Sequence, residues 1–175
     1  MEKVSIEGVI LNARTNAPVL ILKGSKGNIL PIAVGIFEAQ SILLVLEKTS
    51  FLRPLTHDLI KRVVESLSAE FLRLEIHTIK NSVYFAHMVL RTGDRIEKID
   101  CRPSDGIAVA LRFNGNIFVA DSLMSAPESV KYSKSAKFFK TGRKGSPIGQ
   151  SEAEEFRKMI EGMSAKDFWK EINEK

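Results

Sequence analysis

The chain has 175 residues, of which 44% are hydrophobic and 27% charged, a composition typical of a globular protein with one sizeable core. Cys101 is the only cysteine, which excludes an internal disulfide, and no apolar stretch approaches the ~18 residues that a membrane-spanning helix needs. The first residues also lack the basic and apolar pattern of a signal peptide. We therefore expect no membrane association and a cytoplasmic location, where a free thiol stays reduced.

The net charge of +5 is concentrated in one segment of the chain. Residues 1–128 hold 15 basic and 14 acidic residues, whereas residues 129–150 hold six basic residues and no acidic residue. This segment includes Lys134 and Lys137, which we predict to attract the phosphates of a nucleic acid. The alternative is that the lysine run is a solvated segment without a partner, as most charge runs are.

The apolar patterning predicts strands and helices that do not alternate regularly. In chain order, the predicted elements are strands over 4–11, 18–23 and 29–34, helices over 37–46 and 58–67, strands over 70–79, 83–91 and 96–101, a helix over 104–113 and a strand over 117–119. This order indicates an α+β fold with a mixed, largely antiparallel sheet and packed helices.

Residues 1–125 are predicted to form the folded domain, and two segments follow it. Residues 126–150 are rich in Ser, Lys, Gly and Pro with little periodicity, which predicts a linker or an ordered surface arm. In residues 151–175, Ser151 precedes an acidic first turn and Ser164 precedes a second apolar run. We expect two helices here, which form a C-terminal helical hairpin.

One motif occurs twice, each time at a predicted helix start. Each copy has Arg-Pro followed by a hydroxyl residue and an Asp, and the two copies are Arg53-Pro54-Leu55-Thr56-His57-Asp58 and Arg102-Pro103-Ser104-Asp105. We expect Thr56 and Ser104 to cap backbone N–H groups and both aspartates to lie in first turns, where the helix dipole favours negative charge. An arginine beside free amide groups can also bind phosphate.

Acidic residues near the two copies are candidate metal ligands and catalysts. Asp100 ends a predicted strand and Asp105 begins the next helix, so a tight turn can bring both carboxylates to one Mg²⁺ or Mn²⁺ ion. Asp58 and Glu38, which also lie at predicted helix starts, are predicted to join Asp105 in catalysis. Each carboxylate also has a purely structural interpretation, as the partner of a helix dipole or of an arginine.

The basic and hydroxyl residues of the motif are candidates for substrate binding. Arg53 and Arg102 are predicted to bind the phosphate of the substrate, with Thr56 and Ser104 beside them. His57 is the predicted proton-transfer catalyst, because a histidine titrates near neutral pH. In the structural alternative, the arginines pair with the aspartates and His57 has no role in chemistry.

Four ordered blocks of the chain resemble the bifunctional nuclease family. They are LPIAVGIFEAQ at 30–40, RPLTHDL at 53–59, IDCRPSDGIA at 99–108 and IFVAD at 117–121. The resemblance implies a compact α+β fold with a barrel-like sheet, a homodimer, and nuclease activity on both DNA and RNA. The family's motif positions here are Glu38, Arg53, Thr56, His57, Asp58, Asp100, Arg102, Ser104 and Asp105.

Two functions are therefore open at the level of sequence. The first is a metal-assisted nuclease that hydrolyses phosphodiester bonds of DNA or RNA. The second is a non-catalytic regulatory module that binds nucleic acid or protein, in which the motif residues only stabilise the fold. The near-neutral charge of residues 1–128 favours the second, because nucleases usually present a basic surface around the site.

Overall fold

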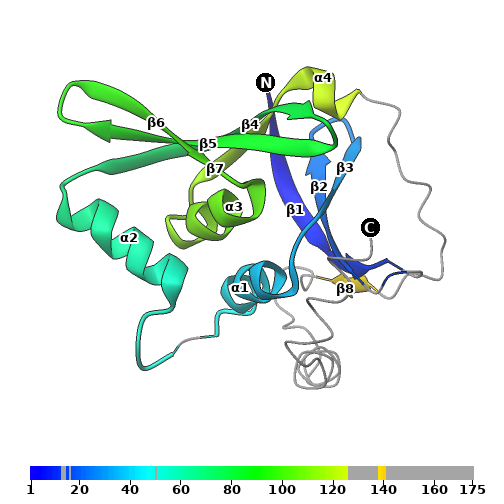
Figure 1. The fold of residues 1–175 in the computed structure, drawn as a ribbon, viewed down its shortest axis with the longest axis horizontal. Coiled ribbons are helices and arrows are strands. Elements are labelled where there is room, and N and C mark those ends of the chain that lie inside the picture. Colours follow the sequence, from blue (N-terminus) through cyan, green and yellow to red (C-terminus); the bar gives the residue numbers. More distant parts are fainter. Residues whose placement is uncertain (13–14, 16, 50, 126–137, 141–175) are drawn as a thin grey trace. The chain divides into compact units, whose positions relative to one another are not determined.

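The computed structural model describes residues 1–12, 15, 17–49, 51–125 and 138–140 (Figure 1). The chain divides into two compact units, Met1–Thr141 and Gly142–Lys175, and every described residue belongs to the first. The predicted C-terminal hairpin and the predicted substrate ligands Lys134 and Lys137 lie outside the described residues.

The described elements confirm the predicted order of strands and helices through residue 119. They are β1 (Glu2–Leu11), β2 (Pro18–Gly24), β3 (Ile29–Ala33), α1 (Ile36–Leu46), α2 (Thr56–Ser66), β4 (Glu70–Lys80), β5 (Val83–Thr92), β6 (Arg95–Cys101), α3 (Pro103–Arg112), β7 (Asn116–Val119), α4 (Asp121–Met124) and β8 (Phe138–Lys140). Two short elements were not predicted, namely α4 and β8. The strand β8 lies within the predicted linker and pairs with β1. No helix in the described part of the chain is long and apolar enough to cross a membrane.

The strands form one mostly antiparallel sheet in the order β3-β2-β1-β7-β4-β5-β6. The pairing of β4 with β7 is parallel, whereas β1 pairs antiparallel with β2, β7 and β8. The α+β fold with a mixed sheet is thus confirmed. The core includes the fully buried side chains of Ile10, Leu20, Leu22, Ile42, Leu74, Ile76 and Ile107.

The sheet is open, which corrects the expectation of a barrel-like sheet. Within the described residues, the end strands β3 and β6 each pair with one neighbour. The edge strand β6 is exposed along most of its length and carries Arg95, Glu97, Lys98 and Asp100. Charged side chains on an edge strand oppose pairing with a further strand, so the sequence of β6 suits an open edge.

The helix α3 is the central helix of the fold. It contacts α1 and α2 as well as strands β4 and β5, and Figure 1 shows it between these strands and α1. Gly106 allows this close packing, because a Cβ added there would lie 2.4 Å from Leu74 Cδ1 and 2.9 Å from Cys101 Sγ. The start of α3 is therefore held against the sheet at the end of β6.

The predicted capping roles of Thr56 and Ser104 are wrong. The N-cap residues are Leu55 for α2 and Arg102 for α3, and neither helix has a side-chain hydrogen bond from its N-cap. Thr56 is the first residue of α2, and Ser104 is the second residue of α3. Pro103 at the first helical position makes Arg102 the cap of α3, because proline is favoured there and needs no hydrogen-bond partner for its nitrogen.

Candidate active site

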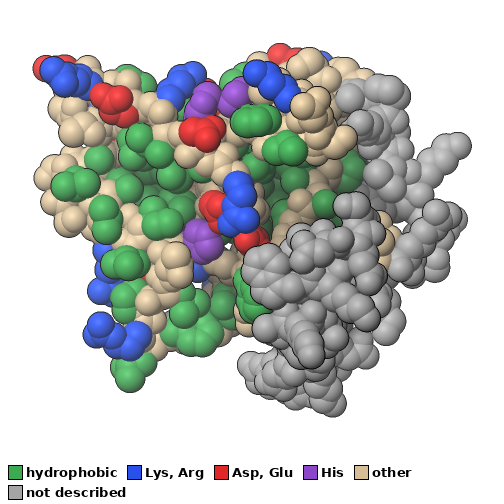
Figure 2. Space-filling model, in the orientation of Figure 1, with side chains coloured by type: hydrophobic (Ala, Val, Ile, Leu, Met, Phe, Trp, Pro, Cys, Tyr) green, Lys and Arg blue, Asp and Glu red, His purple; other side chains and the backbone are tan. Residues whose placement is uncertain are grey.

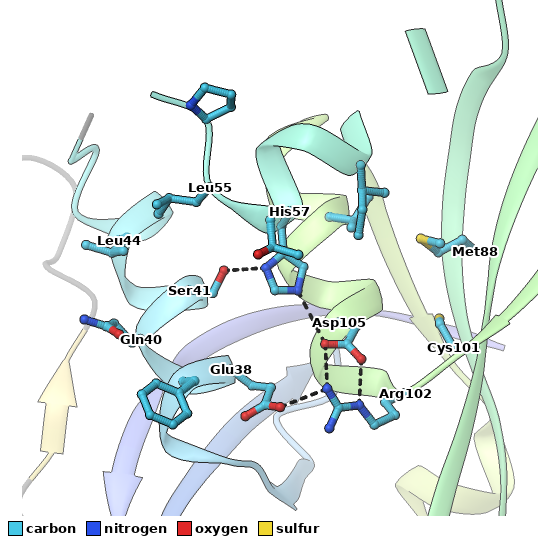
Figure 3. Close-up of a pocket in the computed structure, with 15 residues that line it drawn as sticks. Glu38, Gln40, Ser41, Leu44, Leu55, His57, Met88, Cys101, Arg102 and Asp105 are labelled. Carbon is cyan, nitrogen blue, oxygen red and sulfur yellow. Dashed lines mark hydrogen bonds and ion pairs between the residues drawn. The ribbon is translucent and has the colours of Figure 1, made fainter. Parts of the chain in front are cut away.

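A cavity of about 780 Å³ opens between the three longer helices and the end of β6. Each surrounding element contributes polar side chains to it, as Figure 3 shows. The polar residues that line it are Glu38, Gln40 and Ser41 from α1, Thr56 and His57 from α2, Cys101 from β6, and Arg102 and Asp105 from the start of α3. Five predicted site residues therefore lie around one cavity: Glu38, Thr56, His57, Arg102 and Asp105.

Five side chains form a continuous chain of polar contacts across the cavity (Figure 3). Ser41 Oγ lies 2.7 Å from His57 Nδ1, and His57 Nε2 lies 3.4 Å from Asp105 Oδ1. The Arg102 guanidinium donates to both oxygens of Asp105, from Nε at 2.7 Å and from Nη2 at 3.1 Å. The same Nη2 atom lies 2.8 Å from Glu38 Oε1. Residues from three helices thus converge on one imidazole and one guanidinium.

Solvent exposure changes along this chain of contacts. The Arg102 side chain is 67% exposed, whereas the His57 side chain is 13% exposed and Ser41 is 9% exposed. The hydrogen bond to Asp105 raises the pKa of Arg102 above its usual value, although partial burial opposes the shift. The guanidinium therefore stays charged at the mouth of the cavity, while the imidazole and the serine hydroxyl lie inside.

The cluster carries one net negative charge when His57 is neutral, because Glu38 and Asp105 outnumber Arg102. Figure 2 shows acidic, basic and histidine side chains together near the middle of the viewed face, with a broad apolar area beside them. Two carboxylate oxygens lie on one guanidinium nitrogen, Glu38 Oε1 at 2.8 Å and Asp105 Oδ1 at 3.1 Å from Arg102 Nη2. A cation is thus already bound between the two carboxylates.

The predicted metal-binding pair of Asp100 and Asp105 does not fit the structure. Neighbouring residues of a strand point to opposite faces, and Cys101 lines the cavity, so Asp100 points away from it. Asp100 lies opposite His87 in the sheet and interacts electrostatically with His77. Among the described residues, no group of three or more histidine, cysteine or acidic side chains is placed to hold a metal ion.

Asp58, a predicted catalyst, binds an arginine outside the cavity. Its carboxylate accepts a hydrogen bond from Arg112 Nε and another from the backbone N–H of Leu55 at 2.9 Å. Burial raises the pKa of Asp58, but the hydrogen bonds from Arg112 and Leu55 outweigh it, so the net pKa is lower than usual. Arg112 Nη1 also donates to the carbonyl oxygens of Ala108 at 2.8 Å and Ser41 at 3.3 Å. Arg112 thereby joins α1, α2 and α3.

The model of the bifunctional nuclease domain matches residues 9–131. The chain belongs to the bifunctional nuclease domain family. It is 29% identical over 169 residues to an uncharacterized protein of Mycobacterium tuberculosis strain H37Rv, and this match covers 96% of the chain and 98% of the relative. It is also 32% identical over 102 residues to bifunctional nuclease 2 of Arabidopsis thaliana, with 55% of the chain and 30% of the plant protein covered.

Of three residues predicted to bind substrate in this bifunctional nuclease domain, only one lines the cavity. Arg53 is exposed in the loop before α2 and does not line the cavity. Thr56 lines the cavity from the first turn of α2. Ser104 is 7% exposed and lines a separate pocket of about 270 Å³, which also contacts Arg102. The structure therefore places Thr56, but neither Arg53 nor Ser104, beside His57.

Ser41 is the polar residue of this contact chain that the sequence prediction missed. It lies on a buried face of α1 beside Ile42 and Leu43, where a polar side chain needs a partner. That partner is His57, 16 residues away, which no local pattern indicates. The weak signal in the sequence was a serine among the apolar residues of the predicted helix 37–46.

Cys101 is a poor nucleophile despite its place in the cavity. Burial raises the pKa of its thiol to about 11, so the reactive thiolate is scarce at neutral pH. His57 and Ser41, whose side chains contact each other in the cavity, are better candidates for proton transfer and bond formation. The arrangement can support general acid–base chemistry on an ester whose charge Arg102 balances.

Proposed function

We propose that this bifunctional nuclease domain hydrolyses phosphodiester bonds of DNA and/or RNA in the cavity between α1, α2 and α3. The single observation that carries the proposal is the placement of His57 beside Asp105 and Arg102, within a domain of this family. The name of the Arabidopsis relative, bifunctional nuclease 2, supports the same function.

Each residue has a role that follows from its contacts. Asp105 accepts a hydrogen bond from His57 Nε2 and so orients the ring, which leaves Nδ1 as the atom that takes and returns the proton. Arg102, which is exposed at the mouth, binds the substrate phosphate. Glu38 holds the guanidinium of Arg102 in place until the phosphate arrives.

A divalent metal remains a prediction for this site, but we now propose other ligands than the pair of Asp100 and Asp105 that the sequence predicted. Glu38 and Asp105, rather than Asp100 and Asp105, are the carboxylates that would hold Mg²⁺ or Mn²⁺ beside the substrate. When bound, the ion would offset the negative charge of the cluster and stabilise charge that develops on the phosphate. Such an ion would compete with Arg102 for Glu38 and Asp105, so the roles given above to His57 and Arg102 describe the site without the ion.

The homodimer is also a proposal. Several apolar side chains of α2 and β6 are exposed, including Leu59, Val63, Leu67, Ile96 and Ile99. Figure 2 shows the apolar area that a second copy of the chain could cover. Light scattering of the purified chain would test it, and a monomer at all concentrations would contradict it. The cytoplasmic location likewise stays a prediction, which fractionation of cells would test.

The nuclease assay compares the wild-type chain with Asp105→Asn and His57→Ala. Labelled single- and double-stranded DNA and RNA are incubated with rigorously purified protein, with and without EDTA. We expect the wild type to cleave and each variant to lose about 10²- to 10⁴-fold in rate. Equal rates for wild type and variants would contradict the proposal and indicate a contaminating nuclease. Loss of cleavage on EDTA addition would support the metal.

A second function, a non-catalytic module that binds nucleic acid or protein, is favoured by one observation. The cluster carries a net negative charge, which disfavours a free phosphate. If the pure wild type binds labelled oligonucleotides without cleaving them, and Asp105→Asn changes unfolding but not binding, this second function is the correct one.

A further inference from the structure

The contact between Ser41 and His57 has no role in the function proposed above. A serine within a helix usually hydrogen-bonds the carbonyl of the preceding turn, which is always available to it. Ser41 instead points its Oγ at an imidazole nitrogen of another helix, 2.7 Å away (Figure 3). The opposite nitrogen of the same ring lies 3.4 Å from a carboxylate. A hydroxyl, an imidazole and a carboxylate in this order can generate a nucleophile.

The carboxylate decides which nitrogen of His57 holds the proton. Both oxygens of Asp105 accept hydrogen bonds from the Arg102 guanidinium, so Asp105 acts as a hydrogen-bond acceptor in this cluster. A neutral His57 therefore has its proton on Nε2, which donates to Asp105 Oδ1. This leaves Nδ1 with a lone pair, and the hydroxyl of Ser41 donates to it. The hydroxyl proton of Ser41 is thus directed at the basic Nδ1 atom of His57.

Ser41 is also fixed in position, as a nucleophile must be. It is 9% exposed, it lines the cavity, and its backbone carbonyl accepts a hydrogen bond from the buried Arg112 at 3.3 Å. Glu38 lies one turn earlier on α1 and contacts Arg102. A phosphate that replaces Glu38 on the guanidinium would lie in the cavity that Ser41 lines.

We propose that Ser41 is the nucleophile of this site and that cleavage passes through a covalent intermediate in which a phosphodiester joins Ser41 to the nucleotide that keeps the phosphate. The proposal rests on the proposed phosphodiester hydrolysis. In the first step, Ser41 Oγ forms a bond to phosphorus and transfers its proton to His57 Nδ1. The bond from phosphorus to the leaving oxygen breaks, and the imidazolium returns the proton to that oxygen.

The second step restores the serine. A water molecule gives a proton to His57 Nδ1 and attacks phosphorus, the bond from phosphorus to Ser41 Oγ breaks, and the imidazolium protonates Oγ. The sum is one phosphodiester and one water converted to one phosphomonoester and one alcohol. No other reactant is needed. Compared with a hydrolase in which serine contacts Nε2, the two ring nitrogens have exchanged roles.

The first test compares Ser41→Ala with the matched variant Ser66→Ala. Alanine fits a helix well, and Ser66 lies in the last turn of α2, where its exposed hydroxyl bonds only the Val63 carbonyl in the structure described. We expect Ser41→Ala to lower kcat by about 10³-fold or more and Ser66→Ala to leave it unchanged. Thermal unfolding and oligonucleotide affinity should be similar for both. Retention of at least a tenth of kcat by Ser41→Ala would overturn the proposal.

The second test determines the stereochemistry of cleavage at phosphorus. It distinguishes a nucleophilic Ser41 from a Ser41 that only positions His57, because only the nucleophile adds a second displacement at phosphorus. An oligonucleotide with one chiral phosphorothioate is cleaved in ¹⁸O-labelled water by the wild type. Two displacements give retention of configuration, whereas direct attack by water gives inversion. Retention is the expected result, together with acid-stable ³²P on the peptide that contains Ser41 after rapid quenching.

The outcomes separate this inference from the function on which it rests. Cleavage with inversion, lost in His57→Ala, would overturn the serine nucleophile and leave the nuclease function intact. Absence of cleavage by the wild type on every substrate would overturn both.

Discussion

Two arginine–aspartate pairs stand at the two copies of the repeated motif, and their environments are opposite. Asp58 at the start of α2 pairs with Arg112, whose side chain is 6% exposed and which also binds two backbone carbonyls. Asp105 at the start of α3 pairs with Arg102, whose side chain is 67% exposed and faces the cavity. The first pair joins helices, and the second pair leaves its arginine accessible to a ligand.

The difference follows from spacing within the motif. In the second copy, Arg102 is three residues before Asp105 and caps the helix, so it reaches the aspartate of its own first turn. In the first copy, Arg53 is five residues before Asp58 and lies outside the helix. Asp58 is then available to Arg112, 54 residues later. The same type of motif thus gives a structural contact at the start of α2 and a candidate catalytic contact at the start of α3.

The largest expected effect is on folding, from Arg112→Leu. The change removes a buried guanidinium that satisfies Asp58 and the carbonyls of Ser41 and Ala108, so we expect a loss of about 3 kcal/mol in the free energy of unfolding. Urea unfolding measures it. Arg102→Leu is the matched control, with an expected loss below about 1 kcal/mol because the Arg102 side chain is 67% exposed. Similar losses of stability for Arg112→Leu and Arg102→Leu would contradict the view that only the first arginine holds the helices together.

A smaller effect, on activity, is expected for Arg102→Lys. Lysine keeps the charge but cannot donate two parallel hydrogen bonds to Asp105 or to a phosphate, so kcat/KM should fall by about 10- to 100-fold. Steady-state kinetics with Arg102→Ala beside it separates the roles of charge and geometry. If Arg102→Lys is as active as wild type, only the charge matters.

The pH dependence of stability should report the pair of Asp58 and Arg112. The pKa of Asp58 is lowered in the folded chain, so its ionised form stabilises the fold above the pKa of the unfolded chain, which is about 3.8. This contribution, about 1 kcal/mol, is lost as the pH falls through the lower folded pKa. The difference in unfolding free energy between wild type and Asp58→Asn should therefore be largest near neutral pH and vanish in strong acid. A constant difference would contradict this account.

The smallest effect is expected for Arg53→Ala. Arg53 is exposed and does not line the cavity, so it acts on a nucleic acid only through screened, long-range attraction. We expect kcat/KM to fall by at most about threefold at low salt and the change to disappear at high salt. A loss as large as that of Arg102→Ala would place the substrate over the loop before α2.

The fold could be predicted from the sequence further than the site could. Strands and helices have local apolar periods, and their ends agree with the prediction to within two residues. Sheet closure depends on which edges remain unpaired, and no local period describes that. The expected barrel-like sheet was therefore the main error in the fold.

The site depends on contacts between distant residues. Glu38, His57, Arg102 and Asp105 were found because each lies in a recognisable motif. Asp100 and Asp105 are close in sequence, but the structure does not bring them together at the cavity because Asp100 points to the other face of the sheet. Ser41 was missed because its partner is on another helix.

Gly106 links the sheet to the width of the cavity. A Cβ added there would lie 2.4 Å from Leu74 Cδ1 and 2.9 Å from Cys101 Sγ, so a larger residue would require these side chains or α3 itself to shift. Asp105 is the adjacent residue, and it faces His57 across the gap between two helices at 3.4 Å. If α3 moved to make room for a methyl group at position 106, this distance would change. A residue that does not line the cavity can thus affect the spacing between Asp105 and His57.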